Sequence, residues 1–238
     1  MLIKPPQLKF IFAIVIFLFC QHCVGQQKPA TIKSSAAATP SFVGIPSPLS
    51  SYSIEWTRPI YGECNTAEKT AYLTKTEKDL IYILNLARKY PELFLNTVVK
   101  KYPVRTGNTL LFRNKYYYQS LLTRLQKTRP LPLLQPDDKC YESAYCHAVT
   151  SGEKGYTGHN RQTRDCAAKQ YYNGECADYG HKEALDILMS LLIDQGVPSL
   201  GHRDICLTGK YTLIGVSIQP HIYFNYNAVL DFKIDDKW

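Results

Sequence analysis

The sequence predicts an α+β fold, with helices in the first part of the domain and a pair of strands at its end. Apolar residues recur at helical spacing from Leu80 to Ala87 and again from Ala184 to Leu192. Near the C-terminus, residues 211–219 and 224–234 alternate between apolar and polar side chains, which is typical of half-buried strands. Helices followed by late strands favour a layered α+β domain.

The first predicted helix begins near Thr74, because Thr74 and Glu77 have the spacing of a capping box. Pro91 then restarts the pattern instead of extending it. Three prolines make residues 129–136 an extended connector, after which Asp137 or Asp138 caps a second long helix.

Residues 150–180 are rich in glycine and tyrosine and are expected to form loops with short elements. The amphipathic helix that starts at Ala184 should end at Gly196, with Pro198 beyond it. Pro220 separates the two final strands, which we expect to pair as an antiparallel hairpin.

Length and composition limit the class of protein. The chain has 238 residues, of which 45% are apolar and 12% aromatic, so it can bury a core and is not disordered throughout. Removing residues 1–25 takes away Lys4 and Lys9 and lowers the formal net charge from +8 to +6. This modest and dispersed positive charge does not indicate a nucleic-acid partner. No apolar stretch reaches about 18 residues, so no transmembrane anchor is predicted.

The N-terminus has the parts of a secretory signal peptide. Lys4 and Lys9 precede an apolar run over residues 10–20, and the small residue Gly25 closes a short polar stretch. We expect residues 1–25 to be cleaved near Gly25. The mature chain would then be secreted, or lie in the periplasm or on the cell surface. A Ser-, Ala- and Pro-rich linker is expected over 26–60, and the domain over 61–238.

Six cysteines remain after this cleavage, and an even number in an exported protein favours disulfide bonds. Cys140 and Cys146 should not pair with each other, because in a helix they would lie about 9 Å apart along the axis. A zinc cluster is disfavoured, since none of the six have the C-x-x-C spacing. The disulfide candidates are Cys64, Cys140, Cys146, Cys166, Cys176 and Cys206.

Two histidines and a glutamate form the best candidate site. His159 and His202 each follow a glycine, and Glu175 lies between them in the chain. Two imidazoles and a carboxylate, with a fourth position left to water, are suited to an open Zn²⁺ site. The spacing alone does not bring them together, because they lie 16 and 27 residues apart.

The order of motifs resembles the secreted CAP superfamily (the SCP, or pathogenesis-related-type, domain) in its bacterial form. The resemblance covers residues 74–233. It is carried by Asn85-x-x-Arg88, the segment LQPDDKCYESAYCHA, Gly158-His159, Gly174-Glu175, the segment LLIDQGVPSLGHRDICL and the hairpin LIGVSI…VLDF.

The resemblance implies an α-β-α sandwich, in which an antiparallel sheet is flanked by helices around a surface cleft. By the same resemblance, His159, Glu175 and His202 correspond to the two histidines and the first acid of that cleft, which can take up a divalent metal. Asp194 is the nearest candidate for the second acid. Leu192 stands where many members have tryptophan, so the packing of its helix is expected to differ.

These observations predict a secreted protein whose His/Glu-lined cleft binds a divalent cation such as Zn²⁺, another ligand or an extracellular protein partner. One alternative is a peptidase-like hydrolase with Glu175 as general base. A second alternative is an extracellular lipid or sterol carrier. The sequence contains neither a Gly-x-Ser-x-Gly elbow nor a His-Glu-x-x-His motif, which favours a role other than catalysis.

Overall fold

The structure is a computed structural model that describes residues 44–235, so the predicted signal peptide and the first part of the predicted linker lie outside the described residues. The strands are β1 (Gln135–Pro136), β2 (Gly174–Tyr179), β3 (Leu213–His221) and β4 (Asn225–Lys233). The α-helices of the described residues are α1 (Lys75–Lys89), α2 (Pro91–Phe94), α3 (Tyr102–Arg105), α4 (Ser120–Lys127), α5 (Asp138–Lys154), α6 (Arg164–Ala168), α7 (Ala184–Ile193) and α8 (Gly201–Cys206). The 3₁₀ helices are η1 (Ile54–Thr57), η2 (Pro59–Cys64) and η4 (Thr109–Arg113), and the π-helical segments are η3 (Leu95–Val99) and η5 (Lys115–Gln119).

The four strands form one mixed sheet in the order β1-β3-β4-β2. Strands β3 and β4 form the antiparallel hairpin that the sequence predicts, and β2 pairs antiparallel with β4. The sheet is not wholly antiparallel, because the short strand β1 runs parallel to β3. This strand comes from the proline-rich connector, and its N–H groups that bond to the β3 segment are those of Gln135 and Asp137, on either side of Pro136.

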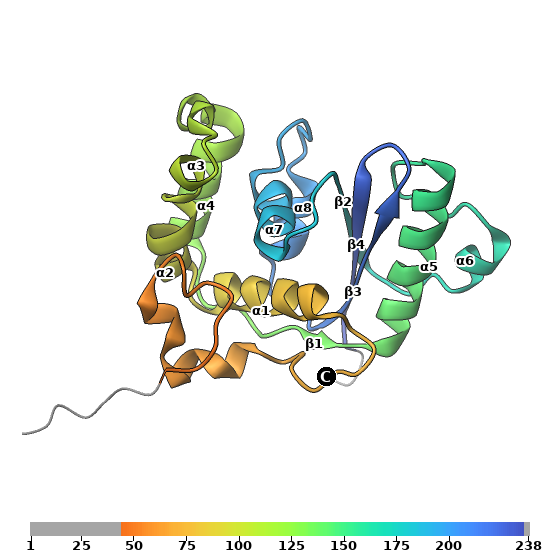
Figure 1. Cartoon of the computed structure of the whole chain (residues 1–238), viewed down its shortest axis with the longest axis horizontal. Coiled ribbons are helices and arrows are strands. Elements are labelled where there is room, and N and C mark those ends of the chain that lie inside the picture. The colour runs from red at the N-terminus through yellow and green to blue at the C-terminus, as the bar shows by residue number, and fades with distance from the viewer. Residues whose placement is uncertain (1–43, 236–238) are drawn as a thin grey trace, which may run out of the picture. The chain divides into compact units, whose positions relative to one another are not determined.

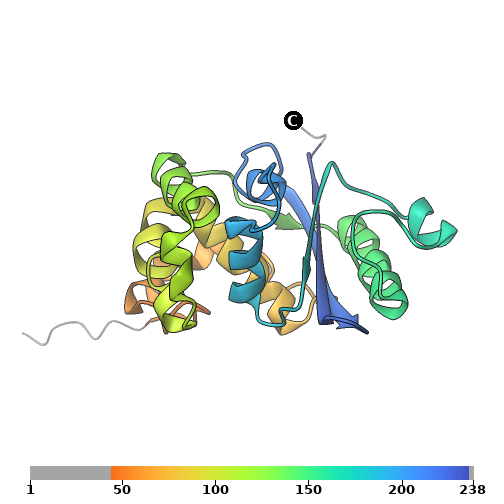
Figure 2. The same cartoon turned by 90° about the horizontal axis from the view of Figure 1, so that it is seen from above.

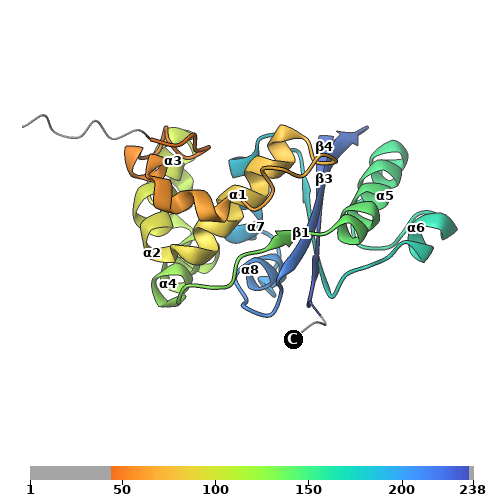
Figure 3. The same cartoon turned by 90° about the horizontal axis from the view of Figure 1, so that it is seen from below.

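Helices cover both faces of this sheet. Helix α5 lies on one face, and α1, α7 and α8 lie on the other (Figure 1). Figure 2 and Figure 3 show the same separation from above and from below. A Cβ atom added to Gly215 of β3 would lie 2.0 Å from the backbone nitrogen of Tyr141, so glycine is what allows α5 to approach the sheet so closely. The structure is therefore a mixed helix and sheet fold.

Helix α1 begins with the predicted capping box, in which Glu77 and Thr74 cap each other. The side chain of Asn85 donates to the carbonyl oxygens of Cys64 and Leu134 and accepts from the Leu134 N–H. Arg88 is fully buried and donates to four carbonyl oxygens, those of Pro132, Cys206, Thr208 and Tyr211. The Asn85-x-x-Arg88 motif thus fastens distant loops to α1.

Residues 44–60 pack against the domain, although the sequence places them in a linker. Leu49 and Trp56 are both completely buried, and the Trp56 indole N–H donates to the Thr97 hydroxyl at 3.0 Å. The packed unit therefore begins earlier than the predicted boundary at residue 61.

Two of the six candidate cysteines form a disulfide bond. Cys146 of α5 is bonded to Cys166 of α6, with a Cα–Cα distance of 5.4 Å, and Cys140 does not pair with Cys146. Cys64, Cys140, Cys176 and Cys206 are buried thiols. Over residues 44–235, none of the helices combines the length and the apolar character that a membrane crossing needs.

Candidate functional site

The first half of the candidate site is an imidazole–carboxylate pair. His159 lies in the loop between α5 and α6, and Glu175 lies on the edge strand β2. The Nδ1 atom of His159 is 2.8 Å from Oε1 of Glu175. The His159 side chain is 53% exposed and the Glu175 side chain only 2% exposed. The glutamate is therefore a buried anchor, and the histidine presents the rest of its ring to solvent. The contact with Glu175 raises the pKa of His159.

Behind His159, Glu175 belongs to a buried charged cluster. Its Oε2 atom is 2.6 Å from a guanidinium nitrogen of Arg161, whose side chain is 3% exposed. Asp231 lies directly opposite Glu175 on β4, and the same Arg161 nitrogen is 3.4 Å from Asp231.

The two carboxyl groups of this cluster have opposite pKa shifts. Burial by itself would raise the pKa of Glu175, but the contacts with His159 and Arg161 outweigh burial and lower it to about 2. Burial and the adjacent charge of Glu175 raise the pKa of Asp231 well above its ordinary range. Glu175 therefore keeps its negative charge to lower pH than Asp231, and Asp231 is the carboxyl group of the pair that takes up a proton first.

The second half of the site is another imidazole–carboxylate pair. Asp194 ends α7 with a left-handed backbone (φ 60°). Its Oδ1 atom is 2.8 Å from Nδ1 of His202, and its Oδ2 atom accepts the backbone N–H groups of His202 and Arg203 at 3.0 and 3.3 Å. Asp194 is 2% exposed. This single carboxylate therefore caps the start of α8 and orients the His202 ring.

The two halves meet in space. The ring centroids of His159 and His202 lie 6.1 Å apart, although the residues are 43 positions apart in the chain. In each ring, Nδ1 contacts a buried carboxylate, so each neutral ring carries its proton on Nδ1 and its lone pair on Nε2. Neither Nε2 atom has a hydrogen-bond partner among residues 44–235. The structure thus brings together all four residues that the sequence singles out, with the two Nε2 atoms as the available groups.

Glu175 takes a different place from the one that the metal hypothesis gives it. Its carboxylate lies on the Nδ1 side of His159, where it orients the ring. Among the described residues, no group of three or more His, Cys, Asp or Glu side chains is arranged to hold one metal ion. The metal-binding atoms that the geometry offers are therefore the two imidazole Nε2 atoms alone.

Sequence reasoning did not assign a role to His147, which supports the loop that carries His159. His147 is fully buried on α5, and burial lowers its pKa, so it is neutral. Its Nε2 is 2.9 Å from the carbonyl oxygen of Gly158, and the Gly158 N–H donates to the Tyr179 hydroxyl at 2.8 Å. Gly158 has a φ of 111°, a conformation that favours glycine. Both contacts fix the backbone immediately before His159.

Two other histidines lie outside the site. His181 pairs with Asp178 at 3.0 Å. His221 contacts the carbonyl oxygen of Tyr156 and accepts the N–H of Tyr223, so both of its ring nitrogens are used by nearby backbone.

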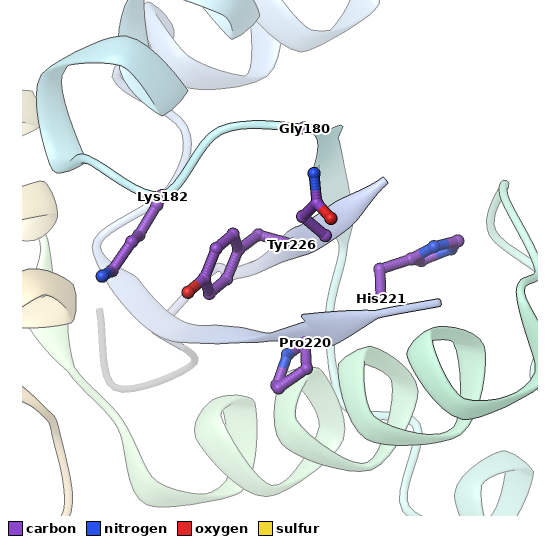
Figure 4. Close-up of a pocket in the computed structure, with 6 residues that line it drawn as sticks. Gly180, Lys182, Pro220, His221 and Tyr226 are labelled. Atoms are coloured by element: carbon purple, nitrogen blue, oxygen red, sulfur yellow. The ribbon is translucent and has the colours of Figure 1, made fainter. Parts of the chain in front are cut away.

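The hairpin end also carries an open hollow of about 560 Å³, lined by Gly180, Lys182, Pro220, His221, Asn225 and Tyr226 (Figure 4). Lys182 lies 5.6 Å from the centre of the Tyr226 ring. The four residues of the candidate site do not line this hollow, and its lining contains no pair of an imidazole with a carboxylate. We therefore do not assign the functional site to it.

Comparison with family models, curated proteins and solved structures finds no match to this chain. The function is therefore inferred from the geometry of the two imidazole–carboxylate pairs.

Proposed function

We propose that this protein binds a divalent metal ion such as Zn²⁺ through Nε2 of His159 and Nε2 of His202. The observation that carries the proposal is that both rings have Nδ1 on a buried carboxylate and a free Nε2. Histidines that bind metals usually donate their other ring N–H to a carboxylate or carbonyl in this way, which fixes the tautomer and makes the ligating nitrogen more basic.

The distance between the rings is close to that of two rings on one ion. At a Zn–N distance of about 2.0–2.1 Å, a bound ion lies about 3.2 Å from each ring centroid, and tetrahedral coordination places the two centroids about 5.2 Å apart. The observed separation of 6.1 Å is larger by about 1 Å, so the half-exposed His159 ring would move toward His202 on binding. Two imidazoles leave coordination positions open, and there the ion would act as a Lewis acid toward water or an anionic ligand.

We further propose that the domain is an exported CAP-like binding module. The order of its motifs and the sheet with helices on both faces support this. The Cys146–Cys166 bond supports export, because such bonds persist in oxidising compartments. Binding is favoured over catalysis by Glu175, since a buried carboxylate that is paired with Arg161 is a weak base.

Titration of Zn²⁺ into the full chain, without a polyhistidine tag, tests the metal site. We expect His159→Ala and His202→Ala each to weaken binding at least tenfold. His181→Ala is the matched control, because His181 also has a carboxylate on Nδ1 but lies outside the site. The proposal is wrong if the first two variants bind Zn²⁺ as tightly as the wild type, or if the control loses affinity equally.

A hydrolase is the second candidate function. A histidine whose Nδ1 contacts a carboxylate is also the arrangement of a general base, and both His159 and His202 have it. In this version an imidazole, and not Glu175, accepts the proton from water. Wild-type protein that cleaves none of a panel of peptide and ester substrates would eliminate this candidate. Cleavage that survives both single alanine substitutions would exclude these two rings as the base.

A further inference from the structure

Two of the buried cysteines are neighbours directly beneath the candidate site. Cys176 of β2 and Cys206 of α8 are both 0% exposed. The Cys176 sulfur lies 3.7 Å from the carbonyl oxygen of His202, one helical turn before Cys206. Burial and the neighbouring Cys206 thiol raise the pKa of Cys176. The Cys176 side chain therefore points from β2 toward the turn of α8 that carries Cys206.

The other two buried thiols have different surroundings. Besides burial, the charged groups that shift the pKa of the Cys64 thiol are Glu63 and Lys89. Those that shift the pKa of the Cys140 thiol are Asp137, Asp231 and Lys233. Of the four thiols, Cys176 and Cys206 are thus the pair whose elements, β2 and α8, pack against each other at these positions.

We infer that Cys176 and Cys206 form a second disulfide bond in the mature protein. The bond forms by exchange with an external disulfide, such as that of a thiol–disulfide oxidoreductase. The two cysteine thiols lose two protons and two electrons and become one S–S bond, while the external disulfide accepts them and becomes two thiols. Because both thiols are inaccessible in the native fold, exchange takes place during folding or in a locally opened state.

This bond would connect the two halves of the candidate site. Cys176 follows Glu175 on β2 and points to the opposite face of the strand, as alternation requires. Cys206 lies on the same short helix as His202. A covalent link between the two elements therefore fixes β2, whose Glu175 anchors His159, relative to α8, which carries His202. This holds whether or not the site binds a metal.

Peptide mapping tests the pairing directly. The full chain is equilibrated in mild denaturant with reduced and oxidised glutathione, its remaining thiols are blocked with N-ethylmaleimide, and it is digested with trypsin. The tryptic peptides 170–182 and 204–210 each contain a single cysteine, namely Cys176 and Cys206. We expect these two peptides to be joined by a disulfide bond and to separate on reduction. Peptides 140–154 and 165–169, which are joined by Cys146–Cys166, are the internal reference. Recovery of both as maleimide adducts, or joined to other peptides, would overturn the inference.

Thermal unfolding gives a second and independent readout. Closing the loop between positions 176 and 206 should raise Tm by about 10 °C, as expected for a loop of about 30 residues in a domain of this size. Reduction should therefore lower the Tm of the wild type by about 10 °C more than that of Cys206→Ala. Cys64→Ala, which also truncates a fully buried thiol, should respond to reduction like the wild type. Equal responses of the wild type and Cys206→Ala would contradict the inference.

Discussion

Replacing the two facing carboxylates of the buried cluster, one at a time, should give opposite effects on stability. Glu175 and Asp231 are partners in the β2–β4 register, and the guanidinium of Arg161 contacts both. Glu175→Gln removes the ionised partner of a buried arginine. Asp231→Asn replaces a carboxyl group whose ionised form is disfavoured by burial and by Glu175 with an uncharged amide of nearly the same shape. We therefore expect a large cost for the first substitution and a gain in stability at neutral pH for the second.

The magnitude follows from the structure. The pKa of Glu175 falls from 4.5 to about 2 in the native state, which corresponds to about 3 kcal/mol of folding free energy. Breaking a buried ion pair from one side costs about 3–5 kcal/mol in other proteins. We expect Glu175→Gln to lower the free energy of unfolding at pH 7 by about 3 kcal/mol. Asp231→Asn should raise it at pH 7, because the Asp231 carboxyl ionises more readily in the unfolded chain than in its buried native position, and the amide does not ionise.

The sign of the pH dependence adds a second measurement. The stabilisation from Glu175 is present above pH 4.5 and is lost as pH falls toward 2, because its native pKa is lowered. For Asp231, whose native pKa is raised, stability declines as pH rises above 3.8. Urea unfolding of both variants between pH 3 and pH 8 measures each contribution. The reasoning is refuted if Asp231→Asn costs as much as Glu175→Gln at pH 7, or if Glu175→Gln is neutral.

Three further predictions concern the site and the sheet. Asp194→Asn keeps a residue that tolerates the left-handed backbone but removes the charge that orients His202, so the Kd for Zn²⁺ measured by titration should rise about 10–100-fold. Zn²⁺ affinity should decline as the pH is lowered, and the decline should begin above pH 6.5. The reason is that the contact with Glu175 raises the pKa of His159, so protons compete with the ion for Nε2. A binding curve that is flat between pH 8 and pH 6 would argue against this ligand. Gly215→Ala should destabilise the fold by at least about 3 kcal/mol in urea unfolding, since the new Cβ would meet backbone atoms of α5 at 2.0 Å; a cost below about 1 kcal/mol would show that α5 can move away.

Local signals in the sequence were sufficient for part of the fold. The capping box at Thr74, the apolar face of α7 and the β3–β4 hairpin are each specified by neighbouring residues, and all are present in the structure. Strand β2 was not predicted, because five of its six residues are buried and no alternation is visible. Its conformation depends on pairing with β4, which lies about 50 residues further along the chain.

The candidate site was predictable in its membership but not in its arrangement. The glycine–histidine and glycine–glutamate motifs, with the family resemblance, selected His159, Glu175 and His202. Nothing in their spacing indicates that Glu175 binds Nδ1 of His159 and not a metal. Arg161 and Asp231 were missed because each comes from a different element: the register of β2 on β4 places Asp231 opposite Glu175, and the loop between α5 and α6 brings Arg161 to both carboxyl groups.

The four carbonyl contacts of Arg88 have a consequence for the motion of the domain. They connect helix α1 to the connector at Pro132 and to the segment from Cys206 to Tyr211. Detaching that segment would leave a buried guanidinium without acceptors, which is far more costly than ordinary fraying of a loop. Backbone amides between 206 and 211 that bond within the protein should therefore exchange their hydrogens with solvent nearly as slowly as those in the middle of α1, although this stretch contains little regular secondary structure.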